Sequence, residues 1–133
     1  MTGTLLMSGW YTVSGITEEY WDLIWYPHIV VLRFAGESFR DFLIRTGPLR
    51  GGLHPKKEAQ EELNSHPRNY ALPTSEIKRV TLHRRRFLRL PRLEILSNSM
   101  EYTFYSRKRN YQCLHDMEKL REIVPSHIKI EVV

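Results

Sequence analysis

The 133-residue chain is 41% hydrophobic and 26% charged, and its formal net charge is +5. This size is typical of one domain, and this composition excludes a wholly disordered chain. One cysteine, Cys113, excludes an intrachain disulfide. The most apolar stretch, residues 21–34, is interrupted by polar residues and falls short of the roughly 20 apolar residues that a transmembrane helix needs. Because the first residues also lack a basic region and a long apolar run, we expect a soluble, cytoplasmic protein.

The N-terminal residues predict strands. Residues 4–14 are expected to form a strand that bends at Gly9 and ends at Gly15. The stretch that begins at Thr17 fits either a short helix or a strand. Residues 28–34 are mostly β-branched and aliphatic, which predicts a buried strand.

A turn and a short helix are predicted next. Residues 35–37 contain a glycine and are expected to form the turn. Residues 38–44 carry Phe39, Phe42 and Leu43 at helical spacing behind Ser38, which favours a short helix over a strand.

Residues 46–73 are predicted to be an insertion between two strands of the single domain. A glycine-rich loop comes first, and residues 55–63 have the composition of a surface helix with a proline in its first turn. Residues 64–73 contain two prolines and are predicted to be a second loop. The stretch holds too little apolar material to form a core of its own.

The C-terminal half predicts an antiparallel meander. Residues 75–88, 90–97 and 100–107 are expected to form three strands with short connections. Sequential short strands of this kind pair with their neighbours along the chain.

A helix is predicted to follow the meander, at residues 110–124. Asn110 is a good N-cap residue, and Pro125 ends the helix. Its apolar face is expected to pack on the sheet. That face consists of Leu114, Met117, Leu120 and Val124. The tail, residues 128–133, alternates like an additional edge strand.

Four segments carry a resemblance to a known family. They are residues 72–80 (LPTSEIKRV), residues 93–95 (LEI), residues 102–105 (YTFY) and the helix with Leu114, Leu120 and Ile123. In this order they resemble a pleckstrin-homology-like (PH-like) domain of the bacterial and archaeal kind, over residues 72–124. The resemblance implies an α+β fold, in which a bent antiparallel β-barrel or sandwich of seven strands is capped by the C-terminal amphipathic helix. It also implies a noncatalytic domain without a cofactor that binds lipids, peptides or other proteins.

Two parts of the chain depart from that family's pattern. The helical insertion at residues 46–73 and the tail after Pro125 are additional to the compact domain. They leave the number of strands in the first sheet open.

The basic residues are concentrated in the C-terminal half. Residues 78–92 hold seven basic residues and no acid, and residues 107–109 add three more. Arginines on both faces of a strand cannot all be buried, so this segment is predicted to project from the sheet as a hairpin with both faces exposed to solvent. The expected binding residues are Arg84, Arg85, Arg86, Arg89, Arg92, Arg107, Lys108 and Arg109. Guanidinium groups suit phosphate, so the expected partner is a phosphorylated lipid headgroup or an acidic protein surface; a solvated hairpin without a ligand is the alternative.

Two other functions remain open at this point. The same arginines fit nucleic acid, with Tyr102, Phe104 or Tyr105 stacking on bases, although no helix-turn-helix, zinc finger or similar motif is present. Glu76 and Lys78 have the spacing found at the end of a nuclease metal site, but the upstream acid that such a site needs is missing.

Other candidate chemistry is weaker. The six histidines are scattered, and no spacing predicts a metal site. Cys113, near the start of the predicted helix, fits either a reactive thiolate or a small core residue. The aromatic residues between Trp10 and Tyr26 fit a core, a subunit interface or a ligand pocket, so a homo-oligomer also stays open.

Overall fold

The computed structural model describes residues 4–39, 44–46, 58–108 and 111–133. The strands are β1 (Leu5–Ser14), β2 (Thr17–Trp25), β3 (Ile29–Phe39), β4 (Ile44–Thr46), β5 (Tyr70–Pro73), β6 (Ile77–His83), β7 (Arg92–Ser97), β8 (Glu101–Ser106) and β9 (Lys129–Val132). The helices are α1 (Ala59–Asn64) and α2 (Cys113–Ile123), and residues Thr74–Glu76 form a short 3-10 turn. The predicted α+β class, mostly sheet with few helices, is confirmed.

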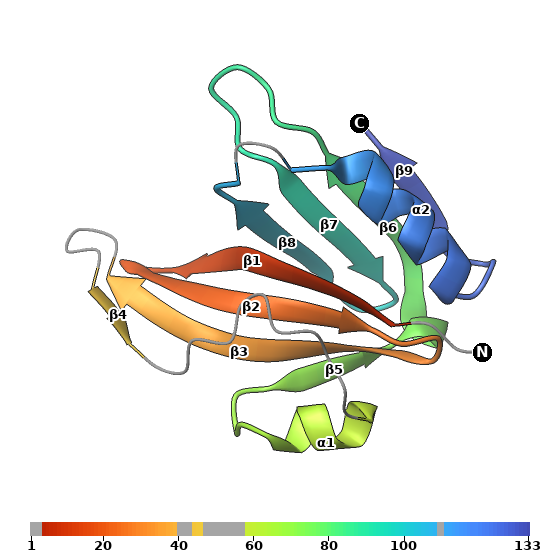
Figure 1. Cartoon of the computed structure of the whole chain (residues 1–133), viewed down its shortest axis with the longest axis horizontal. Coiled ribbons are helices and arrows are strands. Elements are labelled where there is room, and N and C mark those ends of the chain that lie inside the picture. The colour runs from red at the N-terminus through yellow and green to blue at the C-terminus, as the bar shows by residue number, and fades with distance from the viewer. Residues whose placement is uncertain (1–3, 40–43, 47–57, 109–110) are drawn as a thin grey trace.

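All these strands belong to one sheet, which bends strongly (Figure 1). Its order is β4-β3-β2-β1-β8-β7-β6-β9, and β5 pairs with the other end of β3. The pairing of β6 with β9 is parallel, and the other pairings are antiparallel. Within the described residues no pairing joins β9 to the β3 side, so the sheet is open and the closed barrel, one of the two forms that the resemblance implies, is not found.

The first hairpin follows the predicted glycines. The register between β1 and β2 shifts between Met7 and Trp10, and Gly9 there has a φ of 79°. Gly15 has a φ of 62° in the turn between β1 and β2. Glycine adopts such left-handed conformations without steric cost, which confirms both the bend and the break. The stretch that begins at Thr17, for which both a helix and a strand were predicted as alternatives, is the strand β2.

The predicted turn at residues 35–37 and the helix at residues 38–44 are wrong where the structure describes them. β3 continues to Phe39, and Ile44 lies in β4; residues 40–43 lie outside the described residues. Opposite Tyr20 and Trp21 the register of β3 shifts, which gives a bulge rather than a turn. Pairing with β2 on one side and β4 on the other outweighs the helical spacing of a few apolar residues.

The region predicted as an insertion contributes to the sheet. Residues 47–57 lie outside the described residues, and α1 begins at Ala59, later than expected. Tyr70–Pro73, predicted as loop, forms β5 and pairs with Ile29–Leu32 of β3. The β3 ladder satisfies the backbone groups of this short segment, a long-range effect that its composition does not reveal.

The predicted meander is confirmed as β6, β7 and β8, although β6 ends at His83 rather than Leu88. The predicted helix is present as α2, which begins after Gln112; Asn110 lies outside the described residues. Leu114 is exposed instead of packing on the sheet, because Cys113 and Leu120 face the core. The predicted edge strand at the tail is confirmed as β9.

The bent sheet encloses one main hydrophobic core, and α2 packs against β1, β6 and β9 beside it. Trp10, Trp25 and Phe104 are among its largest fully buried side chains. Five of the six N-terminal aromatics (Trp10, Tyr11, Trp21, Trp25 and Tyr26) are buried, which agrees with the core, one of the three alternatives for this segment; Tyr20 is half-buried. A second, smaller cluster lies where Ala59 of α1 packs with Ile24, Tyr26 and Val31.

An arginine is buried next to that second cluster. Arg33 on β3 lies directly across from Asp22 on β2, and its Nη2 donates to Asp22 Oδ2 at 2.9 Å. Its Nη1 donates to Glu62 Oε1 of α1 at 3.2 Å. All three side chains are buried. These ion pairs tie α1 to the sheet.

Candidate anion-binding groove

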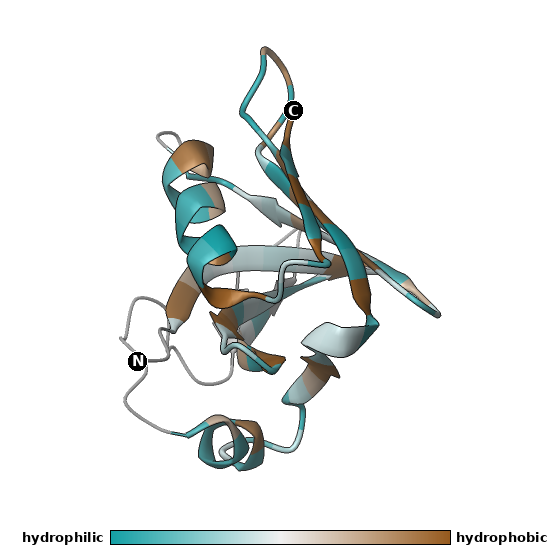
Figure 2. Cartoon of the chain, turned by 90° about the vertical axis from the view of Figure 1, so that its right-hand side faces the viewer, coloured by the Kyte–Doolittle hydropathy of each residue, from teal (hydrophilic) through white to brown (hydrophobic). Residues whose placement is uncertain are grey.

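The candidate site is built on the connection between β6 and β7. We call residues 83–92 the arginine hairpin. Arg86 and Arg89 exchange two backbone hydrogen bonds, of 3.1 and 2.9 Å, so Phe87 and Leu88 form the turn at the tip. In Figure 2 this hairpin rises beyond the rest of the fold, with hydrophilic legs and hydrophobic residues at its tip. The hairpin therefore projects into solvent, as its arginines predicted.

The tip carries two apolar side chains that are almost fully exposed. Phe87 is 91% exposed and Leu88 is 89% exposed. Leu88 also has a φ of 63°, a left-handed conformation that costs a residue with a side chain on the order of 1 kcal/mol. Neither feature contributes to the folded core.

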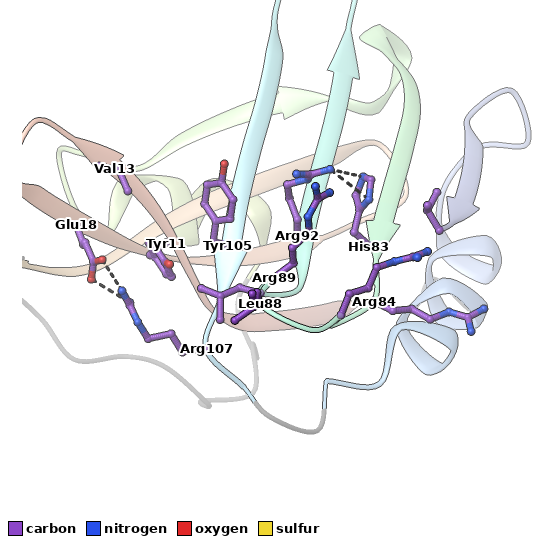
Figure 3. A pocket seen from close by; sticks show the side chains of 13 residues that line it. Tyr11, Val13, Glu18, His83, Arg84, Leu88, Arg89, Arg92, Tyr105 and Arg107 are labelled. Atoms are coloured by element: carbon purple, nitrogen blue, oxygen red, sulfur yellow. Dashed lines mark hydrogen bonds and ion pairs between the residues drawn. The ribbon is translucent and has the colours of Figure 1, made fainter.

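An open groove of about 830 Å³ lies beside this hairpin (Figure 3). Its walls come from the hairpin on one side and from β1, β2 and the end of β8 on the other. The lining residues are Tyr11, Val13, Glu18, His83, Arg84, Arg86, Leu88, Arg89, Leu90, Arg92, Tyr105, Arg107 and Val133. Five of these side chains are arginines and one is an acid, so the groove is strongly positive.

Two tyrosines lie close together in the groove, because β1 and β8 are neighbours. Tyr11 and Tyr105 are direct partners in the register, and their ring centroids are 5.8 Å apart. The Arg107 guanidinium stacks over the Tyr11 ring at 4.2 Å. Burial raises the pKa of the Tyr11 phenol, although Arg107 opposes the shift. The phenol is therefore neutral at physiological pH.

Two of the groove's arginines are already neutralised. Arg107 donates to both carboxylate oxygens of the buried Glu18, at 3.0 and 2.5 Å. Hydrogen bonding to Glu18 raises the pKa of the Arg107 guanidinium above its ordinary value. Arg92 lies 3.4 Å from Glu94, which also contacts His83 at 2.6 Å.

The remaining arginines of the groove have no such partner. Within the described part of the chain, no ion pair joins Arg84, Arg86 or Arg89 to an acid. All three are exposed. Guanidinium groups in this state can bind phosphate or carboxylate in a bidentate manner.

The other predicted binding residues lie elsewhere. Arg85 lines a separate pocket of about 390 Å³, with Arg84 and Cys113. Lys108 lines a pocket of about 250 Å³ next to Trp10 and Asp116. Arg109 lies outside the described residues. The structure therefore brings five of the eight predicted residues, Arg84, Arg86, Arg89, Arg92 and Arg107, to one groove.

The alternative chemistries find little support in the geometry. Phe104 is buried in the core and cannot stack on a base, whereas Tyr105 lines the groove. Among the described residues no group of three or more metal-binding side chains is found. Cys113 is buried, and burial raises the pKa of its thiol, so the predicted core alternative applies rather than a thiolate.

Neither helix in the described ranges has the length and apolar character that crossing a bilayer requires.

Sequence reasoning missed part of the wall opposite the hairpin. Val13 and Glu18 reach the groove through the pairing of β1 with β2 and β8, and no local pattern predicts that pairing. Tyr105, which the sequence offered as a residue that could stack on bases, also lines the groove. Tyr11 belonged to the aromatic segment for which a pocket was one alternative. The hairpin itself was detectable because its arginines are consecutive in sequence.

Comparison with known proteins gives no relative: no family model matches the chain, and no curated protein or solved structure matches it significantly.

Proposed function

We propose that the chain is a noncatalytic, PH-like binding module that uses the arginine hairpin to bind phosphorylated headgroups at an anionic membrane surface. One observation carries this proposal. Two fully exposed apolar side chains, Phe87 and Leu88, form the tip of a hairpin whose Arg84, Arg86 and Arg89 have no acid partner within the described residues.

The charges favour a surface with phosphate groups. A basic residue close to an anionic leaflet contributes about 1 kcal/mol of binding free energy. Three such arginines on one hairpin therefore favour binding by about 3 kcal/mol. Their planar, forked guanidinium groups match phosphate better than lysine does.

The apolar tip favours a bilayer over a fully polar partner. Transfer of a Phe or Leu side chain from water to an apolar environment is worth roughly 1.5–3 kcal/mol. In water, the exposed tip gains none of this free energy. Glycine would fit the left-handed conformation of Leu88 at lower cost, so the leucine side chain is better explained by an intermolecular contact.

The PH-like assignment rests on the order of the elements. The meander β6–β8 is followed by α2, which packs beside the core of a bent sheet. The parallel strand β9 and the unclosed sheet are departures from the pattern that the resemblance implies.

Vesicle sedimentation tests the proposed function. The wild type should bind vesicles that contain phosphatidylserine or a phosphorylated inositol lipid, and should not bind phosphatidylcholine alone. The Arg84→Ala/Arg86→Ala/Arg89→Ala variant should bind about 100-fold more weakly, because it loses about 3 kcal/mol. Added salt should weaken the binding of the wild type.

A charge-matched control separates location from net charge. Lys78→Ala/Lys119→Ala/Lys129→Ala removes the same number of exposed cations, none of which lines the groove. It should bind nearly as tightly as the wild type. Equal loss of binding by both variants, or a wild type that ignores anionic vesicles, would show the proposal to be wrong. Binding to single-stranded DNA in place of vesicles would favour the nucleic-acid alternative.

A further inference from the structure

Five of the seven large apolar side chains that are exposed in the described residues lie in or near the arginine-rich groove. Those with large exposed fractions are Val13, Ile16, Phe87, Leu88, Met100, Leu114 and Val133. Val13, Leu88 and Val133 line the arginine-rich groove, and Ile16 and Phe87 lie within three residues of one of these along the chain. Exposed apolar side chains and arginines therefore occur together in and near this groove.

Three of these side chains, Ile16, Phe87 and Leu88, lie on two separate turns. One is the tip of the arginine hairpin. The other is the turn between β1 and β2, where Ser14 pairs with Thr17 and leaves Gly15 and Ile16 as the turn residues. A Cβ placed on Gly15 would meet nothing within 4 Å. Ile16 is 60% exposed there, although turns usually hold polar residues or glycine.

The acids near the second tip do not oppose an anionic surface. Glu18 is buried and bound by Arg107, and Glu19 is paired with Arg68. A free carboxylate at this wall of the groove would repel phosphate groups. The ion pair of Glu18 therefore leaves both walls compatible with an anionic partner.

We propose that the turn between β1 and β2 is a second bilayer contact, so that both tips dip into the headgroup region and the groove opens toward the membrane. This inference rests on the proposed function, because it assumes that the arginine hairpin binds an anionic bilayer. The partner is the same lipid surface, with apolar contacts from Ile16 and Leu88 on either side of the bound headgroups. Two separated contacts fix the orientation of the domain, which one hairpin alone does not.

Fluorescent labels at single cysteines test this arrangement. In a Cys113→Ala background that retains its fold and its vesicle affinity, Ile16→Cys, Leu88→Cys and Met100→Cys are each labelled with an environment-sensitive dye. Met100 is a matched control, because it is 56% exposed and lies in the turn between β7 and β8, at the end of β7 away from the hairpin. With vesicles of phosphatidylcholine and phosphatidylserine, the labels at 16 and 88 should shift to the blue and be quenched by bromine-labelled lipid, and the label at 100 should not.

The outcomes separate the inference from the function on which it rests. A response at 88 without a response at 16 would overturn the second contact and leave the proposed function in place. An equal response at 100 would overturn the fixed orientation. If wild-type protein fails to sediment with these vesicles, the proposed function itself is wrong.

A polar substitution gives an independent measure. Ile16→Ser should weaken vesicle binding about tenfold, since more than half of an isoleucine side chain remains to be transferred from water. Met100→Ser should leave the affinity unchanged. Equal affinities for the wild type and Ile16→Ser would contradict the inference, and circular dichroism would verify that each variant is folded.

Discussion

Arg33 and the arginines of the hairpin carry the same charge in opposite surroundings. Arg33 is buried between Asp22 and Glu62, beside α1. Arg84, Arg86 and Arg89 are exposed and have no acid partner in the described part of the chain. A buried guanidinium must be neutralised by its own chain, because the loss of hydration is otherwise too costly. The position of the acids, more than that of the arginines, therefore separates a structural role from a binding role.

The largest effect is expected when the buried arginine is removed. Arg33→Ala leaves the buried carboxylates of Asp22 and Glu62 without their guanidinium, and should lower the free energy of unfolding by about 3–5 kcal/mol. Urea denaturation followed by tryptophan fluorescence measures the change. Arg86→Ala is the matched control and should stay within about 0.5 kcal/mol of the wild type. Similar losses of unfolding free energy in the two variants would mean that the buried and the exposed arginine do not differ in their structural role.

Arg107 lies between these two extremes, since an exposed guanidinium binds a buried carboxylate. Arg107→Ala should lower the free energy of unfolding by about 1.5–3 kcal/mol, the usual contribution of hydrogen bonds to a charged group. Adding Glu18→Gln should recover part of that loss, because the buried charge is then gone. The urea midpoints of the wild type, both single variants and the double variant form a cycle that measures the coupling. Additive effects would mean that the pair contributes nothing.

High pH should lower the folding stability through Tyr26, which lies beside α1. Burial, with smaller contributions from Glu62 and Glu58, raises the pKa of Tyr26 to about 12 from an ordinary value of 10.0. The unfolded chain then ionises first, so this contribution to stability is complete below pH 10 and is lost as the pH rises toward 12. Tyr26→Phe should reduce the alkaline loss by on the order of 1–2 kcal/mol. Thermal unfolding at neutral and alkaline pH measures it, and an unchanged slope would exclude Tyr26 as the cause.

The smallest effect on stability is expected at the tip of the hairpin. Leu88→Gly relieves the left-handed strain but adds freedom to the unfolded chain, so stability should rise by less than about 1 kcal/mol. The same variant should bind anionic vesicles more weakly, because an apolar contact is lost. Calorimetry and sedimentation on one preparation measure both. A variant that is destabilised, or that binds as well as the wild type, would assign Leu88 a role in folding instead.

Local patterns predicted the elements that depend on local chemistry. Gly9 and Gly15 marked a bulge and a turn, and the alternating residues of β7 and β9 marked strands. The pattern failed for β5, whose four residues have no strand-like alternation and are held by pairing with β3. It also failed for residues 38 and 39, where partners distant in sequence decide the conformation.

The candidate site divides in the same way. The hairpin arginines were predictable because they are consecutive and cannot all be buried. The arrangement of the opposite wall was not, because the pairing of Tyr11 with Tyr105 joins residues 94 positions apart in the sequence. The neutralisation of Arg107 by Glu18 depends on that same pairing. Sequence therefore indicated the charge of the site but not its shape.

The outer edge of β3 is shared by two strands, and this arrangement affects aggregation. β5 covers Ile29–Leu32, the Asn69 side chain accepts a hydrogen bond from the Phe34 backbone nitrogen at 2.7 Å, and β4 covers Glu37–Phe39. Without these partners, a long strand whose first half is mostly apolar would present free backbone groups to other chains. Loss of the α1 anchor at Arg33 would loosen the segment that leads to β5. Such a variant should form intermolecular β-sheet and precipitate before its core is fully unfolded.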